Sequence, residues 1–164
     1  MAILLSFGLL FATNATAQNL STEEGDITVG AGLALGTNVS IDTEIGINVN
    51  GFYTITDDIR AGANFTYYLI DIDGLSASEF NIDGHYMFRN EDQIVLYGLA
   101  GINIARVSVD TGFAGSVSGS STGINLGGGV EYDVGSVLLF AEPKVSLGGF
   151  DQFNATAGVR LRFN

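Results

Sequence analysis

The amino-acid sequence predicts an all-β fold, an eight-stranded antiparallel up-and-down transmembrane β-barrel. Apolar and polar side chains alternate with a period of two over most of the chain after residue 25, which is the pattern of strands with two different faces. The alternating segments are about ten residues long, as a tilted strand needs to cross a bilayer. Their connections alternate between tight Asp-rich turns and mostly longer stretches, as expected for short periplasmic turns and longer outside loops.

The composition argues against several other classes of protein. The 164 residues are 46% hydrophobic and carry a net charge of −12. No long 3.6-residue periodicity follows the N-terminal segment, so a helical core is not expected. The six Lys and Arg residues do not cluster along the chain, which argues against nucleic acid because phosphate binding needs clustered basic groups. The absence of Cys excludes disulfides and thiolate metal sites.

The N-terminal segment has the features of an export signal. Residues 2–12 form an uncharged apolar run that is too short to span a bilayer as a helix, which needs about 20 residues. Ala15-Thr16-Ala17 follows as a small-x-small cleavage signature. We therefore expect a signal peptide at residues 1–17, cleaved after Ala17, and a barrel domain at residues 18–164. The usual basic residues before the apolar run are missing, so we expect a slightly earlier natural start; a buried N-terminal strand or helix is the alternative.

Eight segments are expected to form the strands. They are residues 26–36, 43–55, 59–69, 78–88, 94–106, 122–133, 136–147 and 153–163. Residues 107–121, rich in Ser and Gly, are expected to form the longest loop. Pro143, the single proline, lies on the apolar face of the seventh segment and lacks an N–H donor, so we expect a bulge or weakened pairing there.

The fifth segment is ambiguous in phase because both of its faces are apolar. We favour an outward, lipid-facing set and an inward pair. The outward set is Leu96, Ala100, Ile102 and Ile104, and the inward pair is Tyr97 and Asn103.

Aromatic residues on the apolar face indicate which side of the barrel contacts lipid. One group lies near the ends of the even-numbered segments and is expected at the periplasmic interface: Tyr53, Tyr86, Phe88, Tyr132 and Phe163. Tyr67 and Phe80 mark the outer interface. Two such bands are typical of membrane barrels, because amphipathic rings favour the headgroup region. A soluble lipocalin-like barrel, which has an apolar inside, is the alternative.

Charged residues on the polar face are expected to form a charge network inside the barrel. They are Glu44, Arg60, Asp83, His85, Glu131, Glu142, Lys144, Arg160 and Arg162. An eight-stranded barrel is just wide enough to be filled by side chains, so these charges must be paired. Inner-face glycines, such as Gly30 and Gly129, leave room for them. The alternative is that these residues face solvent on one side of a sandwich.

The last strand carries the most specific motif in the chain. In Thr156-Ala157-Gly158-Val159-Arg160-Leu161-Arg162-Phe163, a polar residue and a glycine precede two alternating hydrophobic residues, the last of them aromatic. This pattern resembles the C-terminal insertion signal of small OmpA/OmpX-like outer-membrane β-barrel proteins, and the resemblance covers the whole mature chain. It implies that Thr156, Gly158, Leu161 and Phe163 are read by the barrel assembly machinery. Asn164, one residue past the aromatic, departs from the pattern.

No catalytic, metal or cofactor site is expected. His85, the only histidine, lies on the inner face beside Asp83, with no serine placed beside it, and we interpret it as a packing or hydrogen-bonding residue. Asp71-x-Asp73-Gly74 with Glu79 departs from a calcium loop in spacing and in its third ligand. We interpret these acids as a solvated charge cluster; weak binding of divalent cations that bridge to lipopolysaccharide phosphates is the alternative.

The resemblance implies a non-enzymatic, monomeric protein of the bacterial outer membrane, in contact with its lipid and lipopolysaccharide. We expect a structural, adhesive or surface-recognition role carried by the extracellular loops. A narrow pore for ions or small solutes and a soluble lipocalin-like ligand-binding barrel are the two alternatives.

Overall fold

The computed structural model of the chain describes residues 22–37 and 43–164. The expected signal peptide, residues 1–17, lies outside the described residues. Within them, no helix has the length and apolar character needed to cross a bilayer.

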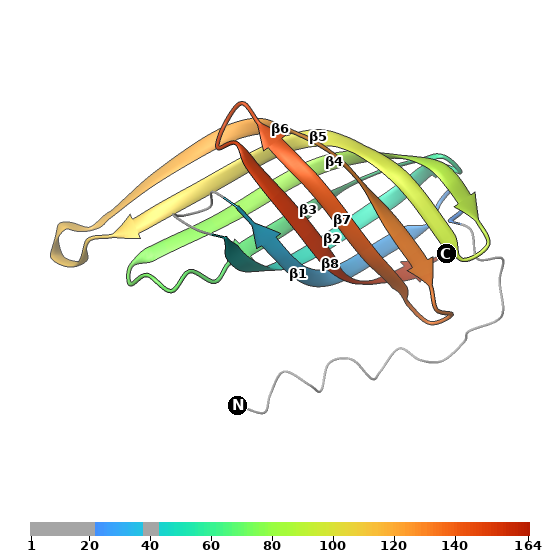
Figure 1. Cartoon of the computed structure of the whole chain (residues 1–164), viewed down its shortest axis with the longest axis horizontal. Helices are drawn as coiled ribbons and strands as arrows, with labels where there is room; N and C mark the ends of the chain where they lie inside the picture. Colours follow the sequence, from blue (N-terminus) through green and yellow to red (C-terminus); the bar gives the residue numbers. More distant parts are fainter. Residues whose placement is uncertain (1–21, 38–42) are drawn as a thin grey trace.

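The described part of the chain forms a closed barrel of eight strands in sequence order, with β1 paired to β8 (Figure 1). Every neighbouring pair is antiparallel. The strands are β1 (Ile27–Gly36), β2 (Glu44–Thr56), β3 (Ile59–Tyr68), β4 (Leu75–Glu91), β5 (Ile94–Asp110), β6 (Ser116–Asp133), β7 (Leu138–Leu147) and β8 (Gln152–Phe163). A 3-10 turn, η1 (Gly112–Ala114), joins β5 to β6. The predicted all-β up-and-down barrel is confirmed.

The two ends of the barrel differ. Tight turns at residues 57–58, 92–93 and 134–137 lie at the end that also holds the C terminus; we call it the turn end. Connections at residues 69–74, 111–115 and 148–151 lie at the opposite end, which we call the loop end. The β5–β6 hairpin projects beyond the other strands at the loop end, on the left of Figure 1.

The predicted loop at residues 107–121 is wrong. Residues 107–110 continue β5 and residues 116–121 belong to β6, and the ladder runs out to Asp110↔Ser116. β4 likewise begins at Leu75, three residues before the predicted start, and ends at Glu91, three residues past the predicted end at residue 88. Ser and Gly disguised these strands, but Val107, Val109 and Val117 supply the β-branched side chains that favour extended backbone.

Pro143 weakens the pairing of β6 with β7 without producing a bulge. The ladder is interrupted between the pairs Gly127↔Lys144 and Val130↔Ala141. The register is the same on both sides of the gap, so no residue is inserted. The missing proline N–H explains the gap.

Small residues let the barrel close between β1 and β8. Gly32 lies directly opposite Gly158, and a Cβ atom on Gly32 would lie 2.4 Å from the carbonyl oxygen of Ala157. No side chain fits at that distance. The seam therefore requires glycine at this position, as expected where two backbones approach closely.

Candidate functional site

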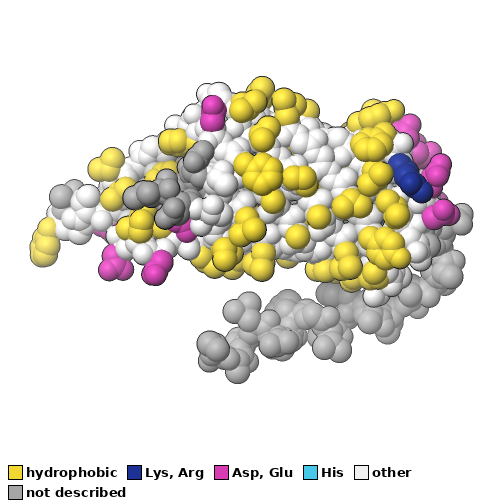
Figure 2. Space-filling view, viewed as in Figure 1, with side chains coloured by type: hydrophobic (Ala, Val, Ile, Leu, Met, Phe, Trp, Pro, Cys, Tyr) yellow, Lys and Arg dark blue, Asp and Glu magenta, His cyan; other side chains and the backbone are white. Residues whose placement is uncertain are grey.

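The outer wall of the barrel is apolar. On every strand the apolar side chains alternate outward, and one row runs Ile82–Ile102–Ile124 across β4, β5 and β6. Each of these side chains is about half exposed. Figure 2 shows apolar side chains spread over the wall, with charged ones gathered toward the ends of the strands. A soluble lipocalin-like barrel would have the opposite distribution.

All seven aromatic residues predicted at the interfaces point outward and are exposed: Tyr53, Tyr67, Phe80, Tyr86, Phe88, Tyr132 and Phe163. The residues expected at the periplasmic interface lie toward the turn end, where Tyr53, Ile27 and Phe163 form one row across β2, β1 and β8. Two further outward aromatics on the strands were not predicted as interface residues. Phe65 lies opposite Phe80 near the loop end, and its outward position in the third segment was the available signal; Phe153 begins the outward face of β8.

The height of this wall matches a membrane. From Thr122 to Tyr132, β6 rises about 33 Å at about 3.3 Å per residue. At a usual tilt of about 40°, this is about 25 Å along the barrel axis, which is the height of the apolar band in outer-membrane barrels.

The polarity of the two faces of the sheet is reversed where the strands project beyond this band. On the outer face, the row Phe80–Ile104–Thr122 is followed by Ser78–Arg106–Ser120 and then by Ser76–Ser108–Ser118. On the inner face, the row Leu75–Val109–Val117 is apolar. Below the reversal the outer face is apolar and the inner face is polar, so the level of Arg106 marks the outer edge of the apolar band.

Two arginines that share one glutamate lie inside the barrel, toward the turn end. Arg60 donates from Nη1 and Nη2 to the two carboxylate oxygens of Glu131, at 2.9 and 2.7 Å. Arg160 also contacts Glu131 and donates from Nη2 to Glu142 Oε2 at 3.0 Å. Tyr97 donates its hydroxyl to the same Glu142 oxygen at 2.7 Å. All five side chains are buried, so the charges are paired as a low-dielectric interior requires.

Aromatic rings complete this layer. The His85 ring lies between Phe52, with centroids 4.3 Å apart, and Tyr97, on which it stacks at 4.4 Å. The Arg160 guanidinium lies 3.9 Å from the centroid of the Phe140 ring. We call this set the arginine layer: Phe52, Arg60, His85, Tyr97, Glu131, Phe140, Glu142 and Arg160.

All strands from β2 to β8 contribute a side chain to the arginine layer. β1 contributes Gly30 instead, and a Cβ atom there would lie 2.5 Å from Arg160 Cγ. The glycine therefore makes room for the arginine, and the side chains of the layer fill the cross-section of the barrel.

His85 is held in one tautomer by its neighbours. Its Nδ1 accepts a hydrogen bond from Arg60 Nε at 3.1 Å. Because the guanidinium only donates, Nδ1 carries no proton and the ring proton lies on Nε2. Nε2 has no hydrogen-bond partner among the described residues and lies 3.9 Å from Glu142 Oε2.

A second interior layer, nearer the loop end, is built from asparagines, and we call it the asparagine layer. The alternation places these residues on the inner face, but their joining into one layer was not predicted. Asn50, Asn64, Asn81 and Asn103 lie directly opposite one another across β2, β3, β4 and β5. Asn81 donates to Asn64 and Asn103 donates to Asn81, both at 2.8 Å. The recurrence of Asn on the inner face of four consecutive strands was the signal that could have identified this layer.

Asp83 links the asparagines to Lys144. It accepts hydrogen bonds from Asn64 and Asn125 at 2.8 and 2.9 Å. Lys144 Nζ lies 3.6 Å from Asp83 Oδ2. Thus seven of the nine predicted network residues lie in these two buried layers.

The other two predicted network residues lie at opposite ends of the barrel. Arg162, at the turn end, is half-buried and contacts Asp133 at 3.3 Å and Asp26 at 3.9 Å. Glu44, the first residue of β2, is half-buried at the loop end, away from the arginine layer. The sandwich alternative is wrong, because the sheet closes on itself.

The N-terminal segment of the barrel domain is fastened across the turn end. Thr22 N–H donates to Asn90 Oδ1 at 3.0 Å, and Asn90 Nδ2 donates to the carbonyls of Thr22 and Asp57 at 2.7 and 2.9 Å. One asparagine therefore joins residue 22, the β2–β3 turn and the end of β4.

The residues that distantly resembled a calcium loop do not converge. Asp71 and Asp73 are exposed in the β3–β4 connection, whereas Glu79 is buried inside the barrel. In residues 22–37 and 43–164, no group of three His, Asp or Glu side chains is arranged to hold a metal ion.

Comparison with known proteins identifies the fold and no closer relationship. No family model matches the chain, and no curated protein matches its sequence. The N-terminal β-barrel domain of Pseudomonas aeruginosa OprF is similar at 17% identity and a TM-score of 0.68, over 87% of this chain and 100% of that one. Neisserial surface protein A is 21% identical, with a TM-score of 0.65, over 84% and 96% of the two chains.

A third structure, Ail, the attachment invasion locus protein of Yersinia pestis, is 18% identical with a TM-score of 0.61, over 85% of this chain and 99% of that one. The structural neighbours are thus small outer-membrane barrels. The fold implied by the resemblance of the last strand is confirmed.

Proposed function

We propose that this chain is an integral protein of the bacterial outer membrane, non-enzymatic, with a structural, adhesive or surface-recognition role carried by its loop end. The observation that supports this proposal best is the polarity of the two faces of the barrel. Paired charges fill the inside, while rows of Ile, Val and aromatic side chains face outward. Lipid is the solvent that favours such a wall. The fold shared with other small outer-membrane barrels supports this proposal.

The proposed orientation places the turn end in the periplasm and the loop end outside the cell. Bacterial outer-membrane barrels have short periplasmic turns and longer outside loops, and the projecting β5–β6 hairpin lies at the loop end. Export through a signal peptide cleaved after Ala17, insertion through the Thr156–Phe163 motif and a monomeric state are parts of the same proposal. Contact with lipopolysaccharide is expected at the outer aromatic band.

The arginine layer favours a structural interior over a catalytic one. Its carboxylates and guanidiniums are bonded to one another, and His85 Nδ1 is occupied by Arg60. Carboxylates and guanidiniums engaged in this way are not free for a substrate, and the His85 ring, whose Nε2 is unpartnered among the described residues, is buried. The exposed residues of the loop end, among them Phe113, are the better place for recognition.

The competing function is a narrow pore. A polar interior favours water, but Arg60 and Glu131 are fully buried and Arg160 bridges between them and Glu142. This packing supports a closed barrel, and we expect no steady conductance in planar bilayers.

Cell fractionation tests the membrane proposal. The protein is expected in the outer-membrane fraction, to be extracted only by detergent, and to migrate faster on a gel before heating than after. A soluble periplasmic protein in the same cells serves as the control. Recovery of the chain with that control would reject the membrane proposal and restore the lipocalin-like alternative.

A further inference from the structure

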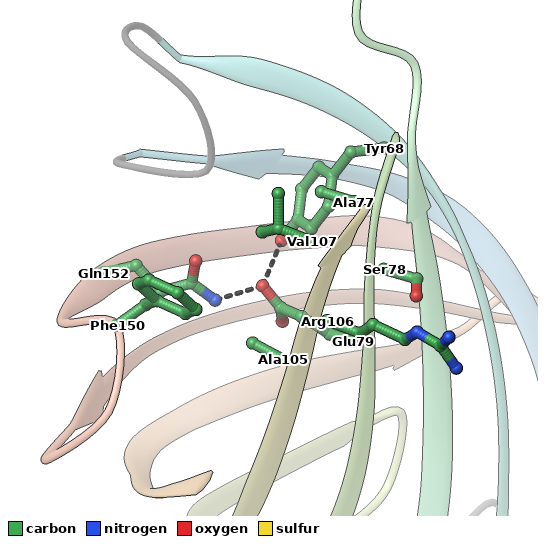
Figure 3. Close-up of a pocket in the computed structure, with 9 residues that line it drawn as sticks. All are labelled: Tyr68, Ala77, Ser78, Glu79, Ala105, Arg106, Val107, Phe150 and Gln152. Atoms are coloured by element: carbon green, nitrogen blue, oxygen red, sulfur yellow. Dashed lines mark hydrogen bonds between the residues drawn. The ribbon is translucent and has the colours of Figure 1, made fainter. Parts of the chain in front are cut away.

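A small pocket opens at the loop-end mouth of the barrel, above the asparagine layer. It is lined by residues from β3, β4, β5, β8 and the β7–β8 connection: Tyr68, Ala77, Ser78, Glu79, Ala105, Arg106, Val107, Phe150 and Gln152. Figure 3 shows the Glu79 carboxylate between the Tyr68 ring and the Gln152 amide, with Phe150 beside Gln152. Ser78 and Arg106 point to the other side of the sheet.

Glu79 differs from every other buried acid in the described part of the chain. Asp83 is paired with Lys144, Glu131 and Glu142 with arginines, and Asp26 and Asp133 with Arg162. Glu79 is only 2% exposed, yet no basic side chain among the described residues forms an ion pair with it.

Neutral donors only partly satisfy this carboxylate. Oε1 accepts hydrogen bonds from the Tyr68 hydroxyl at 2.8 Å and from the Gln152 amide. Oε2 accepts a single long bond of 3.4 Å from Asn103. A carboxylate offers about four acceptor positions, so Oε2 has capacity for a further donor. Because a buried charge without a counter-charge costs several kcal/mol, a cation bound at Oε2 would be stabilising.

The walls of the pocket select the kind of cation. Ala77, Ala105, Val107 and Phe150 present apolar surface around the carboxylate. A hard metal ion requires several oxygen ligands, and no such group is present among the described residues. An ammonium group needs one strong acceptor and tolerates an aromatic face beside it.

We propose that this pocket binds a small organic cation: a primary ammonium on a short apolar stem. The ammonium donates to Glu79 Oε2, and the stem lies against Ala77, Val107 and Phe150. This proposal rests on the proposed function in one respect: the proposed orientation places the mouth of the barrel outside the cell. Exposed acids around the mouth raise the local concentration of cations over a distance that salt shortens: Asp71, Asp73, Asp110 and Asp151.

Binding of n-butylammonium to the folded barrel in detergent micelles tests the proposal, by calorimetry and by the methyl NMR shifts of Ala77, Ala105 and Val107. Saturable binding is expected, with shifts confined to those methyls, whereas n-butanol and butyrate bind undetectably. Equal binding of methylammonium or Mg²⁺ would overturn the proposal, because neither presents an apolar stem.

Two variants identify the residues responsible. Glu79→Gln keeps the shape of the side chain and is expected to weaken butylammonium binding about tenfold or more, a loss of about 1.4 kcal/mol or more. Ala77→Leu fills the pocket, leaves the carboxylate intact and is expected to abolish binding. This variant tests the site if Glu79→Gln does not fold. Asp73→Asn, on the exposed rim, is the matched control and should change affinity less than about twofold in 0.15 M salt. Unchanged binding in Glu79→Gln or in Ala77→Leu would refute the site.

A further binding measurement distinguishes a free amine from a lysine side chain as the ligand, since both carry the same ammonium group. Nα-acetyl-lysinamide is expected to bind more weakly than n-butylammonium, because its backbone amides must enter the apolar mouth. Binding about tenfold tighter, a gain of about 1.4 kcal/mol, would overturn the assignment to a free small cation. Gel mobility of the same samples reports folding, and fractionation reports the membrane location, so failure of the site is distinguishable from failure of the proposed function.

Discussion

Arg60 and Glu131 meet inside the barrel through two parallel hydrogen bonds of 2.9 and 2.7 Å, with both side chains fully buried. They come from β3 and β6, which are not neighbouring strands. The pair therefore bridges the interior of the barrel, and Arg160 joins it on the same carboxylate. Bidentate pairing of this kind adds geometric specificity as well as energy.

Removing the Glu131 charge should strongly destabilise the barrel. Glu131→Gln leaves the two buried arginines with Glu142 as their remaining acid in the arginine layer. Breaking a buried pair by deleting one partner typically costs about 3–5 kcal/mol. Urea unfolding of the protein in lipid vesicles measures this loss.

Arg162→Gln is the matched control for this prediction. Arg162 pairs with Asp133 and Asp26 at the turn end, where its side chain is 16% exposed. Water can replace part of its interactions, so the expected loss is smaller, about 1 kcal/mol. Equal losses in the two variants would mean that the arginine layer contributes no more than the turn-end pairs.

The sequence predicted the inner position of each charged residue but not their partners. Strict alternation on β3 and β8 places Arg60 and Arg160 inside. Which acid they meet depends on closure of the barrel and on the register of strands that lie far apart in the chain. The lack of a basic partner for Glu79 could not be predicted either, because pairing depends on the level of each side chain along the barrel axis.

Boundaries of the strands were predicted within about two residues where one face stays apolar, as on β7. The prediction failed for the β5–β6 hairpin, where the polarity of the two faces reverses at Arg106. A pattern that assigns apolar residues to one face loses phase at such a reversal. The serines that follow on the outer face then resemble a loop.

Removal of the Arg160 side chain tests whether the arginine layer closes the barrel. The wild-type protein is expected to show no steady conductance in a planar bilayer. Arg160→Ala vacates the space between the Phe52 and Phe140 rings and leaves two carboxylates beside it, so a small cation-selective conductance is expected.

Arg106→Ala serves as the control for conductance, because Arg106 is exposed on the outer face beyond the apolar band. It should leave the bilayer trace flat. Steady currents through the wild-type protein would support the pore function and contradict a closed interior.

Arginine substitutions on β5 map the apolar band. Ile102 lies in the middle of the row Ile82–Ile102–Ile124, and Ile102→Arg is expected to cost about 2–4 kcal/mol, as for charges near the bilayer midplane. Ser108→Arg places the same side chain on the same face of the same strand, past the reversal, and should cost about 0–1 kcal/mol. Unfolding in vesicles measures both, and similar losses at the two positions would contradict the assigned outer edge.

Proteolysis of intact cells tests the orientation. Phe113, in the short connection between β5 and β6, is fully exposed, and exposed loop tips are the preferred sites of protease cleavage. External chymotrypsin is therefore expected to cut the chain after Phe113 and to leave two fragments that stay together in the membrane. Phe113→Ser should remove this cut while the protein keeps its heat-dependent gel mobility. If Phe113 were cut only after the outer membrane had been permeabilised, the loop end would face the periplasm, and recognition at the cell surface would have to be abandoned.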